Sequence, residues 1–221
     1  MKIENLLRPN IRKLVPYSSA RSEYSSRDVL YLDANESPFN NGVNRYPDPY
    51  QTELKAAIAR DRGVRPDQLF IGNGSDETLD LLVRAFCEPG KDNIIATPPT
   101  YGMYKVLADI NGVEYREAPL NEDFSLNVKS VLNQINESTK LIFICSPNNP
   151  TGNRFKNEAI SKVVEGVGCL VVVDEAYADY SESYISSVDL DKNTKVIGCQ
   201  TFSKAWGFAG IRLGMLFSSQ K

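Results

Sequence analysis

The sequence contains no histidine, and this absence limits the chemistry that the chain can perform. Imidazole is the commonest general base near neutral pH and the commonest zinc ligand, so its absence excludes His-based catalysis and disfavours a zinc site. Cysteine is scarce: Cys87, Cys145, Cys169 and Cys199 are widely spaced and lie in or beside apolar runs. They form no CxxC pair and no disulfide framework. They are therefore predicted to be buried free thiols in a reducing compartment, and no metal site is expected.

Long hydrophobic runs and blocks of like charge are also missing. The longest apolar runs, near residues 141–145 and 169–173, are far shorter than the ~20 residues that a spanning helix needs. Residues 1–17 lack the continuous apolar core of a signal peptide. A net charge of −3 without charge blocks disfavours a general nucleic-acid binder. With 42% hydrophobic and 24% charged residues, the composition is that of an ordinary soluble globular protein. The missing signal peptide and the short apolar runs predict a cytoplasmic location.

After Pro49 the sequence alternates amphipathic helices with short apolar strands. Helices are predicted over residues 51–62, from residue 75 onward, and over 101–110, 128–135 and 157–167. Strands are predicted over residues 93–97, 113–118, 141–145, 169–174, 195–200 and 213–218. Unbroken apolar strands between helices indicate an α/β domain, with a doubly wound, mostly parallel sheet and helices on both faces. Residues 1–30 show no periodicity and are interpreted as an N-terminal arm ahead of one domain over residues 31–221.

Details of two helices can be predicted as well. Leu54, Ala57 and Ile58 are expected to form the apolar face of the first helix. Ser75 is expected to cap the second helix, with Asp76 in its first turn.

Five polar, Gly/Pro-rich segments occupy the positions that follow strands. They are residues 72–76, 98–101, 146–152, 174–177 and 201–204. In open α/β sheets, ligands bind beyond the carboxyl ends of the strands, where such loops converge. The five segments are therefore predicted to form one site.

Each segment alone has an ordinary interpretation beside the functional one. Lys204, at a strand end, is either a solvated side chain or a desolvated nucleophile. Asp174 closes a buried strand, where it either makes a helix cap or ion pair or keeps a ring nitrogen protonated. The adjacent Glu175 is expected to turn outward or make a structural bond. The turn around Asn149 suits backbone requirements, and the start of the helix at Ser75 is either an ordinary cap or a phosphate site without the lysine of a P-loop.

The order of these segments is more informative than any one of them. A glycine-rich helix start at residues 72–77 precedes Pro-Pro-Thr-Tyr at 98–101, Asn-Pro-Thr-Gly at 149–152, Asp-Glu-Ala-Tyr at 174–177, and Ser203-Lys204 with Arg212. This order resembles the fold-type-I pyridoxal-phosphate aminotransferases, whose chemistry rests on a cofactor-bearing lysine and a carboxylate at the pyridinium nitrogen. Residues 32–38, 44–49 and 99–104 resemble the histidinol-phosphate aminotransferase branch in particular.

The resemblance implies a role for each matching residue around the pyridoxal 5′-phosphate ring. Lys204 would carry the cofactor and then move a proton between the substrate Cα and the cofactor C4′. Asp174 would keep the pyridine nitrogen protonated. Asn149 and Tyr177 would hydrogen-bond the ring's phenolic oxygen, and Tyr101 would stack on the ring.

The resemblance also implies the phosphate and substrate contacts. The backbone amides of Ser75 and Asp76, with Ser203 and Arg212, would hold the phosphate. Tyr46 would reach the phosphate of the neighbouring subunit in a homodimer. The implied substrate residues are Tyr17, near the entrance, and Asn35.

The implied activity is transamination of histidinol phosphate with 2-oxoglutarate in L-histidine biosynthesis, with no nucleic-acid or membrane partner. An aromatic or broad-range aminotransferase, a threonine-phosphate decarboxylase and a non-catalytic cofactor-binding remnant remain alternatives. Members of the family have a second, smaller domain that supplies the arginine for the substrate carboxylate. Because the chain stops at Lys221, the expectation is a chain without that domain and with activity near background.

Overall fold

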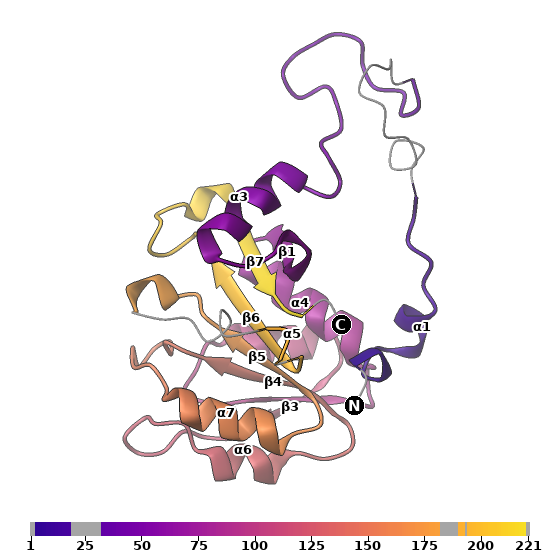
Figure 1. Cartoon of the computed structure of the whole chain (residues 1–221). Coiled ribbons are helices and arrows are strands. Elements are labelled where there is room, and N and C mark those ends of the chain that lie inside the picture. Colours follow the sequence, from indigo (N-terminus) through magenta and orange to yellow (C-terminus); the bar gives the residue numbers. More distant parts are fainter. Residues whose placement is uncertain (1–2, 19–31, 182–189, 193, 220–221) are drawn as a thin grey trace.

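The computed structural model of the chain describes residues 3–18, 32–181, 190–192 and 194–219, and its centre is one mixed sheet (Figure 1). In this part of the chain the sheet has seven strands in the order β1-β7-β6-β5-β4-β2-β3. The strands are β1 Leu69–Asn73, β2 Asn93–Ala96, β3 Glu114–Glu117, β4 Thr139–Cys145, β5 Leu170–Asp174, β6 Val196–Thr201 and β7 Leu213–Phe217.

Strand direction determines which loops meet at one edge. Strands β3, β2, β4, β5 and β6 are paired in parallel, whereas β7 runs antiparallel to both β6 and β1. Consequently β1 points the same way as β6, and β7 starts at the edge where the other strands end. The predicted α/β class and mostly parallel sheet are confirmed. The sequence pattern does not predict strand β1, because it is a five-residue edge strand with a glycine and an exposed Phe70, which weakens its apolar pattern.

Five helices lie close to the predicted positions: α3 Thr52–Arg62, α4 Ser75–Phe86, α5 Met103–Ile110, α6 Val128–Gln134 and α7 Asn157–Gly166. The short helix α1 Pro9–Arg12 lies in the predicted arm, where the sequence pattern predicts no helix. Short 3-10 helices are η1 Ile3–Asn5, η2 Pro66–Gln68, η3 Ala178–Tyr180 and η4 Ala209–Ile211. None of the helices in the described ranges is long and apolar enough to cross a membrane.

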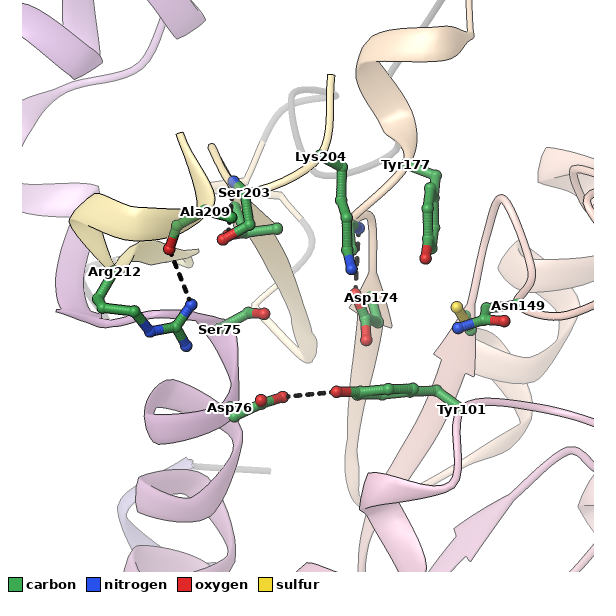
Figure 2. Close-up of a pocket in the computed structure, with 13 residues that line it drawn as sticks. Ser75, Asp76, Tyr101, Asn149, Asp174, Tyr177, Ser203, Lys204, Ala209 and Arg212 are labelled. Carbon is green, nitrogen blue, oxygen red and sulfur yellow. Dashed lines mark hydrogen bonds between the residues drawn. The ribbon is translucent and has the colours of Figure 1, made fainter. Parts of the chain in front are cut away.

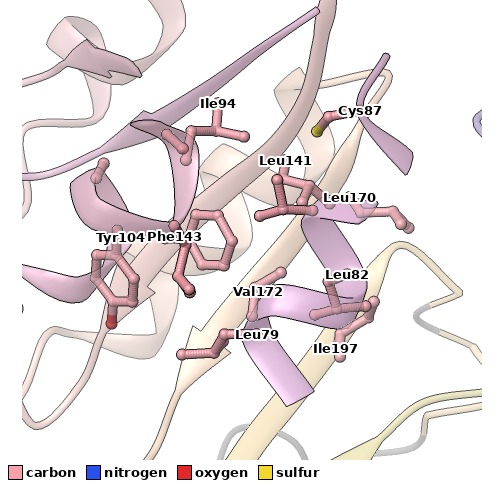
Figure 3. Packing of buried hydrophobic residues seen from close by; sticks show 14 of the residues in the cluster. Leu79, Leu82, Cys87, Ile94, Tyr104, Leu141, Phe143, Leu170, Val172 and Ile197 are labelled. Carbon is pink, nitrogen blue, oxygen red and sulfur yellow. The ribbon is translucent and has the colours of Figure 1, made fainter. Parts of the chain in front are cut away.

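Strands β2, β4, β5 and β6 bury both of their faces, as their unbroken apolar character predicts. On one face, Leu141, Phe143 and Val172 pack with residues of α4 and α5 (Figure 3). On the other face, Ile142 and Val173 pack with residues of α6 and α7. A third cluster joins α3 to β1 and β7. Because neighbouring strand residues point to opposite sides, the helices form two layers around the sheet.

Two predicted details of the helices are wrong. In α3, Leu54 and Ala57 are exposed, and the buried residues are Ile58 and Ala59. The helix packs against β1, at the edge of the sheet, and the adjacent β7, so its buried face is narrower than the sequence suggests. Helix α4 is capped by Gly74, and Ser75 is its first helical residue rather than its cap.

The start of the predicted arm packs against the domain. Leu6 is buried in the cluster formed with α4 and α5. Arg8 forms an ion pair with Glu88 at 3.2 Å and donates to the Arg84 carbonyl. Residues 19–31, which include most of the rest of the predicted arm, lie outside the described residues. The segment that precedes α3 extends away from the sheet (Figure 1).

Candidate functional site

The five predicted segments meet in one cavity at the carboxyl edge of the sheet (Figure 2). It is lined by Ser75, Asp76, Tyr101, Cys145, Asn149, Asp174, Ala176, Tyr177, Thr201, Ser203, Lys204, Ala209 and Arg212. Each of the five segments contributes at least one residue, so their predicted convergence is confirmed. Arg212 joins them because it directly precedes the reversed strand β7, which starts at this edge.

Asp174 lies at the bottom of the cavity, at the end of β5, and only 2% of its surface is exposed. Its Oδ2 accepts a hydrogen bond from the Tyr104 hydroxyl at 2.7 Å, and its Oδ1 accepts one from the Ala176 amide at 3.1 Å. Burial raises the pKa of Asp174 to about 6, against the opposing effect of these two donors. Within the described residues it forms no ion pair, so the carboxylate is buried without a cation.

The neighbouring carboxylate makes a different set of contacts. Glu175 is also buried, but its Oε2 accepts a hydrogen bond from Gln200 Nε2 at 2.9 Å. It does not line the cavity. Glu175 therefore makes a structural bond, one of the two expected outcomes, and only Asp174 faces the site.

Lys204 follows β6 and extends its side chain into the cavity beside Tyr177 (Figure 2). Its Nζ lies 5.5 Å from the centroid of the Tyr177 ring. Two other lysines near the sheet are engaged elsewhere. Lys195 donates to the carbonyls of Val164 and Val167, and Lys105 pairs with Asp109. Of these three lysines, only Lys204 reaches the cavity.

One end of the cavity is formed by the start of α4. The N-cap is Gly74, no side chain caps the helix, and the helix begins at Ser75. A Cβ on Gly74 would clash with the guanidinium of Arg212, and a Cβ on Gly214 would clash with Gly74 and the Ser75 nitrogen. The two glycines therefore allow the start of the helix, β7 and Arg212 to approach closely. Uncapped amides, the positive end of a helix and a guanidinium are groups that can bind an anion.

Tyr101 reaches from the loop that follows β2 to the start of α4. Its hydroxyl donates to Asp76 Oδ1 at 3.1 Å, and burial with the nearby Asp76 raises the pKa of Tyr101. Asn149 and Tyr177, from the loops that follow β4 and β5, also line the cavity (Figure 2). The Tyr101 hydroxyl therefore stays protonated at neutral pH, and its ring is left as the surface that a planar ligand can contact.

The side chains of Asn148 and Asn149, which are adjacent in one turn, make different contacts. Asn148 donates to the Pro99 carbonyl at 2.9 Å and to Thr151, and it accepts a hydrogen bond from Thr100. These contacts fasten the turn to the segment that carries Tyr101. Asn149 is then left to line the cavity.

Three predicted site residues do not line this cavity. Tyr17 is 92% exposed and Tyr46 is 69% exposed, and neither they nor Asn35 contribute to its walls. All three lie in the segments before α3, outside the loops at the strand ends. Their roles remain predictions that depend on a second subunit or a substrate.

Three residues that contact or line the site are not identified as site residues from the sequence. Tyr104 contacts Asp174 directly, yet in the sequence it stands out only as part of the motif at residues 99–104. Cys145 and Ala209 also line the cavity. The signal that could have identified Tyr104 is its position three residues after Tyr101, in the first turn of the helix that follows the site loop.

Comparison with known proteins gives consistent matches. The family model described as aminotransferase class I and II matches residues 31–221. Histidinol-phosphate aminotransferases from Christiangramia forsetii and Bacteroides thetaiotaomicron are 54% and 53% identical over 99% of this chain. The chain spans 63% of the length of each of these relatives.

A solved structure is also similar. The histidinol-phosphate aminotransferase from Sinorhizobium meliloti, in complex with pyridoxal-5′-phosphate, has a TM-score of 0.72 and 27% identity. The match covers 80% of this chain and 49% of that one.

Proposed function

Because the chain belongs to the class I and II aminotransferase family, we propose that it forms the pyridoxal-phosphate site of an enzyme that transaminates histidinol phosphate with 2-oxoglutarate. The reaction belongs to the biosynthesis of L-histidine. The proposal is supported by the cavity as well as by the relatives, because the side chains required for this cofactor chemistry line one space.

The cavity residues fit the cofactor in charge and in shape. The uncapped start of α4, with Ser75, Ser203 and Arg212, suits a phosphate dianion. The Tyr101 ring suits a planar heteroaromatic face. Asn149 and the hydroxyl of Tyr177 lie across the cavity, where they would hydrogen-bond the ring's phenolic oxygen.

When bound, this cofactor supplies an electron sink for negative charge that develops at the substrate Cα. Asp174 would hold a proton on the ring nitrogen, because an anion in a site of low dielectric favours the cationic form of the ring. Lys204 would bind the cofactor through Nζ. Once displaced by the substrate amine, Nζ would accept the proton from Cα and return it to C4′.

The single observation that carries the proposal is the buried, unpaired charge of Asp174 in the cavity that Lys204 enters. Burying a carboxylate without a cation costs free energy unless a partner is supplied. A protonated ring nitrogen is such a partner. A structural role alone would not require Asp174 to face a cavity.

Cofactor binding is tested by absorption spectroscopy and chemical trapping. Addition of pyridoxal phosphate should give the yellow chromophore, and borohydride reduction followed by peptide mapping should label Lys204. Lys204→Ala should lose the chromophore, whereas Lys105→Ala, which removes an exposed lysine paired with Asp109, should keep it. Label on Lys195 or Lys105 in the parent chain would refute the assignment.

The substrate is tested on the cofactor-loaded chain by the spectral change that each amino compound produces. We expect histidinol phosphate to act at lower concentration than an aromatic amino acid. A stronger response to the aromatic amino acid would favour a broad-range aminotransferase. Release of carbon dioxide from threonine phosphate would favour a decarboxylase. A chromophore that no amine perturbs would indicate a protein that only binds the cofactor.

The working form would be a homodimer in the cytoplasm. Tyr46 is exposed and lies apart from the cavity of its own chain, which suits a contact with the phosphate of a second subunit. All four cysteines are free and buried, which suits a reducing compartment.

A further inference from the structure

The hydroxyl of Tyr104 makes a short contact with Asp174. Tyr104 belongs to α5 and is fully buried, and its hydroxyl donates to Asp174 Oδ2 at 2.7 Å. Its ring stacks on Phe143 with a centroid distance of 4.9 Å and an interplanar angle of 14° (Figure 3). It also meets the ring of Tyr101 edge to face at 5.7 Å. Packing on both sides therefore fixes the direction of the hydroxyl.

Two donors hold the carboxylate from different directions. Tyr104 donates to Oδ2 from α5, which packs on one face of the sheet, and the Ala176 amide donates to Oδ1 from the loop that follows β5. Each carboxylate oxygen can accept more than one hydrogen bond, so both retain capacity for a ligand. The plane of the carboxylate is thereby set before any ligand enters.

Few other groups around Asp174 stabilise its negative charge. In the sheet register, Asp174 lies between Cys145 and Cys199. Both thiols are buried, and burial with the nearby Asp174 raises the pKa of each above its ordinary value. The other titratable groups that face the carboxylate are Asp76 from α4, Tyr101, the adjacent Glu175, and Lys204, whose side chain points toward it.

The tyrosine acts only as a donor in this pair. Burial and the charge of Asp174 raise the pKa of Tyr104 well above its usual value, so its hydroxyl keeps the proton. For Asp174 the same hydrogen bond has the opposite effect, because it favours the ionised carboxylate and lowers its pKa. Without the hydroxyl, burial and the neighbouring Asp76 and Glu175 would act with less opposition.

We propose that Tyr104 is a positioning residue for Asp174, which fixes the orientation of the carboxylate and stabilises its negative charge. The inference rests on the proposed function, in which this carboxylate meets a protonated ring nitrogen. It assigns adjacent tasks to two neighbouring tyrosines: Tyr101, in the loop before α5, lines the cavity, and Tyr104, in the first turn of α5, supports Asp174.

The first test needs no cofactor. The cofactor-free chain is labelled with carboxyl-13C aspartate, and the Asp174 signal is assigned by its loss in Asp174→Asn. We expect the Asp174 midpoint to rise by about one pH unit in Tyr104→Phe, the size of shift that loss of one good donor produces. The matched control is Tyr115→Phe. Tyr115 packs against the same cluster but has no hydrogen bond to Asp174. The Asp174 midpoint in Tyr115→Phe should therefore equal that of the parent. An unchanged midpoint in Tyr104→Phe overturns the proposal.

The second test compares two probes that differ only at the ring nitrogen. These are pyridoxal phosphate and its 1-deaza analogue, in which C–H replaces the nitrogen. At a pH below the Asp174 midpoint, where binding requires the carboxyl to ionise, Tyr104→Phe should weaken binding of pyridoxal phosphate about tenfold, as one pKa unit implies, and change binding of the analogue little. Equal losses for both probes would indicate a merely structural role and overturn the proposal. Failure of the proposed function has a separate sign, because the parent chain would then bind neither probe while the 13C titration still reports on the pair.

Discussion

Arg62 and Asp179 form a bidentate ion pair that joins the end of α3 to the loop that follows β5. Arg62 Nη1 lies 2.7 Å from Asp179 Oδ1, and the two side chains are only 6% and 16% exposed. The guanidinium also lies over the rings of Phe202 and Trp206, at 5.5 and 5.7 Å from their centroids. Arg62 therefore fastens together the two loops that carry Tyr177 and Lys204.

The first prediction concerns this ion pair. Arg62→Lys should lower the free energy of unfolding by about 2 kcal/mol, because lysine supplies neither the bidentate contact nor the stacked plane. A urea titration measures the change. In Arg65→Lys, the same substitution in a half-exposed pair with Asp191, the loss should be much smaller. Equal losses in the two variants would show that burial does not increase the contribution of the Arg62–Asp179 pair to stability.

The second prediction concerns the pH dependence of stability. Burial raises the pKa of Asp174 from 3.8 to about 6, so the folded chain favours the protonated carboxyl more than the unfolded chain does. The resulting stability is complete below about pH 4 and is lost as the pH rises through about 6. A shift of this size corresponds to at most about 3 kcal/mol.

Asp174→Asn should remove this contribution. Urea midpoints of the cofactor-free variant should fall less between about pH 4 and about pH 7.5 than those of the parent, because the parent loses the Asp174 contribution over this range. Asp109→Asn changes an exposed carboxylate and should preserve the parent's pH profile. Parallel profiles for Asp174→Asn and the parent would show that Asp174 does not titrate in this range.

The third prediction concerns the anion site at the start of α4. Gly214→Ala should weaken binding of pyridoxal phosphate by at least about tenfold, because the new Cβ would push Gly74 and the Ser75 amide away from Arg212. Binding is measured by the absorbance of the bound cofactor. Gly168→Ala introduces a Cβ with no neighbour within 4 Å and should bind like the parent. Parent-like binding by Gly214→Ala would mean that cofactor binding does not need the close approach of β7 to the start of α4.

The fourth prediction concerns assembly. Sedimentation should show a dimer, and Tyr46→Phe should weaken cofactor binding although Tyr46 lies outside the cavity of its own chain. In a mixture of Tyr46→Phe and Lys204→Ala chains, each mixed dimer should contain one site with both residues intact. A clean monomer with ordinary cofactor affinity would contradict the contribution of a second subunit.

Much of the domain could be predicted from local sequence patterns. The apolar runs at β2, β4, β5 and β6 identify buried strands because both faces of the sheet are covered. The alternation of strands with helices predicts parallel pairing, and parallel pairing brings the loops at the strand ends together. That is why the positions of Asp174, Asn149 and Lys204 just after predicted parallel strands assign them to one site, and all three line the same cavity.

The limits of prediction have physical causes too. Strand β1 lies at an edge, where burial on one side leaves a weak pattern. The cap of α4 depends on the positive φ of Gly74, which the close approach of Arg212 and Gly214 requires. A serine followed by two acids looks like a cap from sequence alone, because the residues that force the turn are far away in the chain.

The sequence by itself therefore determined the fold class, the strand-end loops and the residue types of the site, since these follow from short-range periodicity and strand order. Only the tertiary structure decided which partners those residues have. The reversal of β7 brings Arg212 to the start of α4, and the packing of α5 against Phe143 brings the Tyr104 hydroxyl to Asp174. Both contacts join residues that are distant in the chain, and each depends on how layers pack rather than on any local preference of the backbone.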